Sequence, residues 1–240
     1  MEWRDQGIVL SLRAHGETAA ILEVLTAEHG RHLGVVHGGQ SRKKVPLLQA
    51  GNQVDVTWRA RLESHLGTWS GVELQRSRMS LVLSDPLRLQ ALSAICALAA
   101  FFLPERERQG QFYAETEGLL DAVASGEGWL RDVIFWEMAL LAEGGMPLDL
   151  RSCAVDGGAN DLSYVSPRTG RAVSRRGAGD WADRLLPLPE VMLGGPATLA
   201  GVVESLGVTG HFLGKLAVSL GDRPVPAARE RLHAALTREL

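Results

Sequence analysis

The sequence predicts an α+β protein of two domains, with a small five-stranded β-barrel followed by an all-α domain that holds an irregular or hairpin insert. Three observations predict this fold. Five short runs rich in strand-forming residues follow one another within residues 7–80. Helical periodicity begins after Asp85-Pro86. Residues 150–180 then lose this periodicity and are rich in Gly, Ser, Asn, Asp and Arg.

Glycines and turn-forming residues separate the five expected strands, and single glycines at Gly30, Gly51 and Gly67 mark the breaks. Five strands in roughly 75 residues fit the OB-fold, a barrel whose strand face and loops bind oligonucleotides. Within it we expect Trp58 in the core. The expected strands are residues 7–13, 20–26, 32–37, 53–59 and 67–74.

A proline after Ser84-Asp85 is typical of a helix start, so the helical domain is expected to begin there. We therefore expect an OB-fold nucleic-acid-binding domain over residues 1–80. A helical domain follows over residues 81–240, with the insert at about 150–180. The expected helices are residues 87–103, 110–125, 127–143, 181–186, 198–206, 212–220 and 227–240.

The net charge is −3 and the pI is about 6.2, whereas a simple nucleic-acid binder commonly has a pI above ~9. The distribution is more informative than the total. Residues 1–80 hold 10 Lys and Arg against 8 Asp and Glu, and residues 81–240 hold 15 against 20. Positive charge is therefore local to the expected barrel, where a groove for DNA needs it.

The sequence contains no segment with the pattern of a membrane span or of a signal peptide. The longest apolar run, near residues 87–103, is too short and too polar to span a bilayer. The first residues are polar and acidic, unlike a signal peptide. Two cysteines make no disulfide framework. We expect a cytoplasmic protein without membrane contact.

Residues 37–44 are the strongest local feature, since two glycines precede a hydroxyl and three adjacent cations. The alternative is a solvated hairpin tip. Arg59 and Arg61 are expected to share one strand face. Trp69 is a candidate for base stacking, or else packs inside. The candidate DNA-binding residues are Arg31, His32, His37, Ser41, Arg42, Lys43, Lys44, Arg59 and Arg61.

A second candidate basic patch lies in the insert, where closely spaced arginines suit phosphates or an acidic peptide, or form a solvated loop. Its residues are Arg168, Arg171, Arg175 and Arg176.

A catalytic constellation is not found. The sequence lacks a phosphate-binding loop, a dinucleotide fingerprint and an H-E-x-x-H motif. His29, His32 and His37 are not expected to converge on a metal. Cys96 is expected to be buried in a helix. We therefore expect a protein that is not an enzyme and has no metal site.

Several segments together resemble the RecO family of DNA repair and recombination mediators. They cover most of the chain in the family's order and spacing. The segments are Gly7-Ile-Val-Leu, Gly16-Glu17, Thr26-Ala-Glu-His-Gly-Arg31, Gly34-Val-Val-His-Gly-Gly39 with Ser41-Arg42, Pro46-Leu-Leu-Gln-Ala-Gly-Asn52, Trp58-Arg-Ala-Arg-Leu-Glu63 with His65-Leu-Gly67, Leu150-Arg-Ser-Cys-Ala-Val155 and Tyr164-Val-Ser-Pro-Arg-Thr-Gly170.

The resemblance implies a non-enzymatic mediator that binds single- and double-stranded DNA and anneals complementary strands. It implies three protein partners: RecR, the C-terminal tail of the single-strand-binding protein SSB and, indirectly, RecA, which is loaded onto SSB-coated DNA. An acidic, apolar tail needs an apolar pocket beside a cation. Lys215 and Arg223 are the candidate cations.

The chain departs from the family in its cysteines, because many members hold zinc through two C-x-x-C pairs in the insert. One thiolate cannot complete a tetrahedral zinc site, so we expect no zinc and no other cofactor. The insert is then expected to be held by hydrogen bonds and packing, with Tyr164 and Val165 as anchors. The positions that correspond to the family's ligands are Cys153, Asp156 and, near the second pair, Val173 and Arg176.

Two other classes of function compete with this interpretation. One is a pure protein–protein adaptor whose OB-fold does not bind DNA directly, which the net negative charge favours. The other is a metal-dependent hydrolase that uses the histidines, for which the sequence offers no suitably spaced ligand set.

Overall fold

The computed structural model describes residues 1–62 and 64–240. The chain forms two compact units, Met1–Glu127 and Gly128–Leu240. The sequence predicts a boundary near residue 80, and the first unit takes in the barrel together with the helices that follow it up to Glu127. Each unit is described by itself below.

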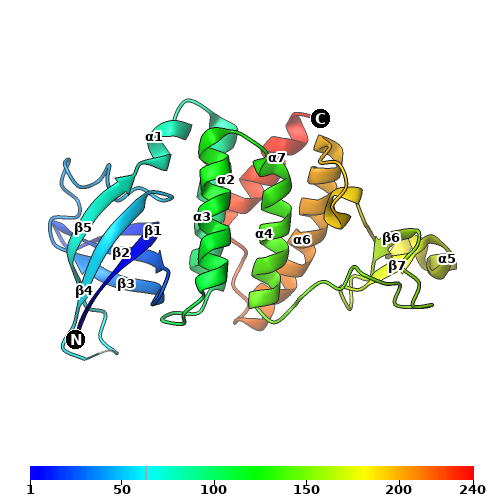
Figure 1. Ribbon diagram of the computed structural model, residues 1–240, viewed down its shortest axis with the longest axis horizontal. Helices are drawn as coiled ribbons and strands as arrows, with labels where there is room; N and C mark the ends of the chain where they lie inside the picture. The colour runs from blue at the N-terminus through cyan, green and yellow to red at the C-terminus, as the bar shows by residue number, and fades with distance from the viewer. Residues whose placement is uncertain (63) are drawn as a thin grey trace. The chain divides into compact units, whose positions relative to one another are not determined.

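The first unit begins with a closed five-stranded barrel in the order β1-β2-β3-β5-β4 (Figure 1). β1 pairs with both β2 and β4 and so closes the barrel. This confirms the predicted barrel and its place in an α+β fold. The strands are β1 (Glu2–His15), β2 (Ala19–Thr26), β3 (Gly30–Val36), β4 (Gln53–Arg59) and β5 (Thr68–Arg76).

β1 is longer than its apolar run indicates, because it starts at Glu2 rather than Gly7. Its polar beginning pairs with β4 from Glu2 opposite Arg59 to Ile8 opposite Gln53. Alternate residues in this stretch are exposed, which explains why it lacks a strand-like apolar pattern. Pairing with a distant strand, rather than local composition, extends the strand and closes the barrel.

Two tryptophans fill the barrel core. Trp58 is 0% exposed and its indole N–H donates to the carbonyls of Leu33 and Leu66. Trp69 is 3% exposed and donates to the carbonyl of Leu22. The core position predicted for Trp58 is confirmed. Trp69 takes the inside alternative, so it offers no ring to a base.

Three helices complete the first unit: α1 (Arg78–Val82), α2 (Pro86–Phe102) and α3 (Gly110–Ser125). Asp85 caps α2 by accepting from the amides of Leu87 and Arg88, as the sequence predicts. After α2 the chain returns to the barrel, where the Arg106 amide donates 2.9 Å to the Arg31 carbonyl. Gly30 permits this approach, since a Cβ there would lie 1.9 Å from the Glu107 carbonyl oxygen.

Buried arginines explain why the helices belong with the barrel. Arg78, at the start of α1, is fully buried and donates to Gln53 and the Gly51 carbonyl of the barrel. It also donates to Asp121 of α3 over 2.6 Å. Arg31 of β3 donates to the Leu103 carbonyl at the end of α2. These bonds join segments across the boundary that the sequence pattern indicated.

The second unit packs α4 (Trp129–Glu143), α6 (Leu199–Ser219) and α7 (Ala227–Arg238) around a common core, with α6 touching both other helices. α6 is one continuous helix, whereas we expected two helices separated at residues 207–211. Val208 and Thr209 in that stretch are buried, and Thr209 donates to the buried Glu137 of α4. Tertiary packing therefore overrides the weak helix propensity of the glycines beside them.

The insert is a small three-stranded sheet in the order β7-β6-β8, as the hairpin prediction indicated. Val165 is fully buried, and Tyr164 packs against a core of Cys153, Val173 and Ala178, which confirms both predicted anchors. Among the described residues, no helix has the length and apolar character needed to cross a membrane. The insert elements are β6 (Leu162–Val165), β7 (Ala172–Ser174), α5 (Arg175–Ala178), η1 (Gly179–Arg184), β8 (Leu186–Pro187) and η2 (Glu190–Leu193).

Candidate nucleic-acid interface

Residues 37–44, here called the basic loop, leave the end of β3 in a series of tight turns. The Ser41 amide donates to the Gly38 carbonyl, and the Lys44 amide to the Ser41 carbonyl, each over 3.0 Å. Gly38 has φ +65°, a left-handed conformation that favours glycine. The turns continue to Leu48, which is 2% exposed in the barrel core. The loop is thus anchored at both ends.

The cations of the basic loop point into solvent, since Arg42, Lys43 and Lys44 are all exposed, as are His37 and Ser41. The Lys44 ammonium donates 2.8 Å to the His37 carbonyl, which holds the loop's two ends together. Within the described residues, no carboxylate forms an ion pair with any of the three cations. Three positive charges therefore lie close together, ordered by the backbone and open to phosphate.

The basic loop is also fastened to the β1–β2 hairpin. The Gln40 side-chain amide donates to the carbonyls of Gly16 and Ala19 over 3.0 and 2.7 Å. This contact brings the exposed Arg13 and His15 of β1 into the same region as the loop cations. The sequence interpretation missed both residues, because the hairpin lies more than 20 positions earlier. The local sequence held one sign of this contact, which is the glutamine at position 40 after the pair Gly38-Gly39.

Arg31 and His32, two of the predicted contacts, face the interior. The Arg31 guanidinium is 14% exposed and forms an ion pair with Glu23, itself 8% exposed at its side chain. His32 is 4% exposed and lies among Trp3, Trp58 and Trp69. The burial of His32 and the pairing of Arg31 with Glu23 and Glu105 disfavour both side chains as phosphate contacts. We therefore leave both out of the proposed contact set.

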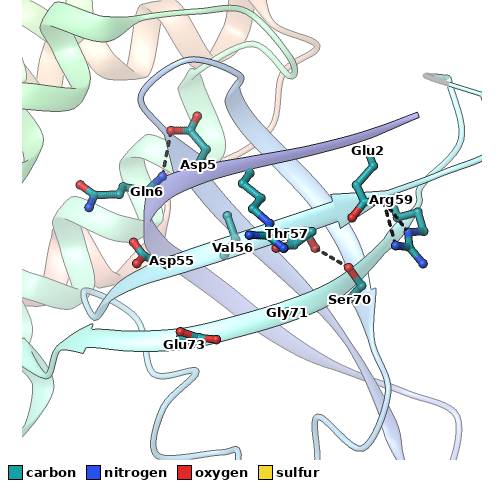
Figure 2. Close-up of a pocket in the computed structure, with 11 residues that line it drawn as sticks. Glu2, Asp5, Gln6, Asp55, Val56, Thr57, Arg59, Ser70, Gly71 and Glu73 are labelled. Atoms are coloured by element: carbon teal, nitrogen blue, oxygen red, sulfur yellow. Dashed lines mark hydrogen bonds and ion pairs between the residues drawn. The ribbon is translucent and has the colours of Figure 1, made fainter.

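Arg59 lies on a concave face of the barrel that is acidic. Its guanidinium donates twice to Glu2, over 3.1 and 2.8 Å, and four carboxylates against two arginines line a cavity of about 860 Å³ there (Figure 2). We call this surface, formed by β1, β4 and β5, the acidic face. Its carboxylates are those of Glu2, Asp5, Asp55 and Glu73, and its arginines are Arg4 and Arg59.

Arg61 does not share a strand face with Arg59, because β4 ends at Arg59 and Arg61 lies exposed in the loop beyond it. The expected alternation therefore stops before Arg61. The strand register places Arg59 beside Thr68 and Thr68 beside Val35. Two inter-strand steps of roughly 4.8 Å thus separate Arg59 from the strand that leads into the basic loop.

The insert exposes all four arginines of the second basic patch. Arg171 lies 3.5 Å from Asp149 and Arg175 lies 3.6 Å from Asp161. Exposed pairs of this kind are weak. Arg168 and Arg171 line a cavity of about 390 Å³ with Trp181. The patch therefore has an aromatic neighbour that the sequence interpretation did not associate with it.

The two candidate cations for a peptide tail differ in their surroundings. The Lys215 ammonium donates to the carbonyls of Pro167 and Arg168, each over 3.0 Å, and so ties α6 to the insert. Arg223 is exposed and lines a groove of about 280 Å³ with Val218 and Val225. The Lys215 ammonium also lies 5.5 Å from the centre of the Phe212 ring, whereas Arg223 keeps Val218 and Val225 beside it in a groove of the kind that a tail peptide needs.

Cys153 and Asp156, which the resemblance aligned with zinc ligands, lie beside Ser174 in the insert. Cys153 Sγ accepts from the Ser174 amide over 3.3 Å, and the Ser174 hydroxyl donates to Asp156 over 3.3 Å. A Cβ on Gly177 would lie 2.9 Å from Cys153 Sγ. Ser174 and Gly177 thus contact Cys153 directly, and Val173 packs against Cys153 in the core of the insert.

The pKa values of the two buried thiols shift in opposite directions. Burial would raise the pKa of the Cys153 thiol, but hydrogen bonds from Ser174 and from neighbouring backbone amides outweigh it and lower that pKa. Burial raises the pKa of the Cys96 thiol to about 12, which fits its predicted core position. Among residues 1–62 and 64–240, no group of three or more His, Cys, Asp or Glu side chains is arranged to hold a metal ion.

Comparison with known proteins decides the family. The family "Recombination protein O N terminal" matches residues 1–78, and "Recombination protein O C terminal" matches residues 83–214. The chain belongs to the RecO family. A DNA repair protein RecO of Dinoroseobacter shibae is 58% identical over 239 residues, covering 99% of both chains. Another, from Cereibacter sphaeroides, is 55% identical over 240 residues and 99% of both chains.

The fold agrees with this membership. The family's N-terminal part coincides with the closed barrel, and its C-terminal part begins between α1 and α2. A third relative, from Jannaschia sp., is 52% identical over 241 residues and carries the same name, DNA repair protein RecO. The predicted family and the two-domain α+β fold class are both confirmed.

Proposed function

We propose that this RecO family member is a non-enzymatic mediator of DNA repair and recombination that binds single-stranded DNA through its basic loop. The observation that supports this most directly is the exposed, anchored cluster of Arg42, Lys43 and Lys44 on an OB-fold barrel. Arg13, His15, His37 and Ser41 lie close enough to extend the contact. Beyond Arg59, which pairs with Glu2, Arg61 is the next exposed cation along the chain.

The proposed chemistry is electrostatic. Cations on the loop replace the counterions of a DNA strand, which supplies affinity without sequence preference. Partial neutralisation of two strands lets complementary bases meet, so annealing requires no general acid, general base or nucleophile. Double-stranded DNA offers the same phosphates and binds the same loop.

The family's protein partners complete the proposal. The mediator acts with RecR in the cytoplasm to help load RecA onto DNA coated by SSB. The groove beside Arg223 is the proposed site for the acidic, apolar tail of SSB, because a cation there adjoins Val218 and Val225. The acidic face of the barrel repels DNA and is left for a protein contact.

Replacing Arg42, Lys43 and Lys44 together by alanine is expected to weaken binding of an oligothymidylate. Three lost phosphate contacts should flatten the slope of log K against log salt by about 2 units for a single strand. Fluorescence anisotropy across a sodium chloride titration measures both the affinity and the slope.

The matched control replaces three exposed arginines elsewhere, Arg131, Arg231 and Arg238, by alanine and so changes the net charge equally. This control should keep the wild-type slope. Equal slopes for the loop variant and the wild-type protein would remove the loop from the proposed contact.

We also propose that the insert folds without zinc. Ser174 caps α5 by accepting from the Gly177 amide over 3.0 Å, in addition to its bonds with Cys153 and Asp156. Ser174→Ala is expected to cost about 1 kcal/mol of unfolding free energy. Exhaustive dialysis against EDTA should leave the urea unfolding midpoint unchanged. Stoichiometric zinc in the purified protein, lost together with stability on chelation, would contradict this proposal.

A second candidate function is a protein–protein adaptor whose barrel does not touch DNA, and the acidic face favours it. A gel-shift experiment with a short oligonucleotide at low salt separates the two. A shift that disappears in the basic-loop variant supports the mediator. The absence of any shift with the wild-type protein supports the adaptor.

A further inference from the structure

We propose that the insert holds a second contact for single-stranded nucleic acid, in which a base stacks on Trp181 while Arg168 and Arg171 hold the neighbouring phosphates. This inference rests on the proposed DNA binding and adds a separate site to it. We call the cavity of about 390 Å³ between these residues the insert pocket.

Trp181 differs from the other tryptophans in its exposure. Its side chain is 63% exposed, whereas Trp58, Trp69, Trp129 and Trp136 are each at most 5% exposed. The exposed ring lines the insert pocket together with Val173, Ala178 and Leu185. The Arg184 guanidinium lies over the ring, 4.8 Å from its centre, in a cation–π contact. An exposed ring in a pocket with nearby cations is a platform on which a base can stack.

The insert pocket combines an apolar floor with cationic edges. Val173, Ala178 and Leu185 form the floor, and they belong to or pack against the insert's own core. Arg168 and Arg171 lie at the edge, on the turn between β6 and β7. No carboxylate lines the pocket among the described residues. A flat, uncharged group fits the floor, and an anion fits the edge.

The charge pattern favours a nucleotide over an acidic peptide. Residues 162–179 contain four arginines and no Asp or Glu, but Asp180 and Asp183 flank Trp181 and are exposed. Negative groups are therefore favoured beside Arg168, whereas the ring, with two aspartates and one arginine beside it, favours a neutral group. A nucleotide meets this requirement, because its base is neutral and its phosphate lies one sugar away.

The Arg171 guanidinium lies 3.5 Å from the Asp149 carboxylate, and both side chains are close to half exposed. Such a pair is weak, so a phosphate can replace the carboxylate at small cost. Arg175 and Arg176, exposed on α5, extend the positive surface for the next phosphates of a strand. The insert thus supplies one stacking position and a short cationic track.

The experiment uses the full chain and an oligothymidylate that contains 5-iodouracil. Irradiation should form a cross-link at Trp181, located by mass spectrometry of the peptides. In unmodified DNA the quenching of tryptophan fluorescence should be smaller for Trp181→Phe than for the wild-type protein. Trp181→Ala is expected to weaken binding about tenfold, as measured losses per stacked base indicate. An abasic oligomer of the same length should bind without quenching Trp181.

The phosphate contacts are tested by replacing Arg168 and Arg171 with alanine, against a control that replaces Arg231 and Arg238. Only the first pair should weaken binding. All four arginines are exposed, so both variants are expected to fold, which circular dichroism checks.

Full affinity in Trp181→Ala with no cross-link at Trp181 overturns this inference. If the basic-loop variant still loses affinity, the proposed function survives that result. No binding of any oligonucleotide by the wild-type protein overturns both. Quenching of Trp181 by an acidic apolar peptide, but not by DNA, would instead make the insert pocket a peptide site.

Discussion

Replacing Arg229 by leucine is expected to lower the unfolding free energy of the second unit by about 3–5 kcal/mol, the usual cost of removing one partner of a buried ion pair. Arg229 of α7 is 5% exposed and Glu137 of α4 is 1% exposed. The guanidinium donates to both carboxylate oxygens over 3.0 Å, and also to Thr209 and the Leu206 carbonyl of α6. Its loss leaves a buried carboxylate without its cation and loosens three helices together.

Urea denaturation gives the change in unfolding free energy, and hydrogen exchange in α6 locates it. The double variant Glu137→Leu, Arg229→Leu is the matched control, because it removes both charges. Replacing a whole buried pair by apolar residues is often neutral or stabilising, so the double variant should recover much of the loss. A double variant less stable than Arg229→Leu would show that the charge pair is not the cause.

Replacing Arg78 by methionine is expected to cost the first unit about 2–4 kcal/mol, since buried acceptors left without a donor each cost about 1–3 kcal/mol. Arg78 is fully buried and donates to Gly51, Gln53 and Asp121. Methionine fills similar space but cannot donate. Urea unfolding of the full chain, with hydrogen exchange in β4 and α3, measures the effect.

Arg76→Ala is the matched control, because Arg76 binds the same Asp121 but is 56% exposed at its side chain. An exposed ion-pair partner contributes at most about 1 kcal/mol to the unfolding free energy. A loss for Arg76→Ala as large as that for Arg78→Met would contradict the importance of burial.

The contacts of Arg76 and Arg78 with Asp121 make the stability of the first unit depend on pH. Partial burial would raise the pKa of Asp121, but hydrogen bonds from Arg78 and Arg76 outweigh it and lower that pKa below its usual 3.8. The ionised Asp121 carboxylate therefore stabilises the folded unit above its ordinary pKa of 3.8. This contribution is lost as the pH falls through the lower pKa of the folded state. Arg78→Met should reduce the dependence of unfolding on pH in that acidic range.

The sequence predicted the parts of the candidate site that depend on local pattern. The two glycines before Arg42, Lys43 and Lys44 predicted a tight, exposed cationic turn, and the structure has one. The same patterns could not place Arg31 or Trp69. By local pattern Arg31 is a surface cation. In the fold its guanidinium donates to Glu23 and to the Leu103 carbonyl, 8 and 72 positions away, and these bonds hold it in a mostly buried position.

Trp181 shows the opposite case. Its position at the start of a short helical segment gave no reason to join it to Arg168, 13 residues earlier. The fold of the insert brings the two to one pocket, because η1 packs against the core that supports the β6–β7 turn. Exposure of a side chain depends on which distant segments cover it, and local periodicity does not contain that information.

By itself the sequence determined the five strands, the order of the main helices, the hairpin insert and the basic loop, because each follows from apolar spacing, turn residues and caps within a few positions. The tertiary structure alone decided the closure of the barrel by the polar start of β1, the union of α1–α3 with the barrel and the continuity of α6. It also decided which cations face solvent. These features depend on buried pairs between residues far apart in the chain, such as Arg78 with Asp121 and Arg229 with Glu137, whose partners the fold selects.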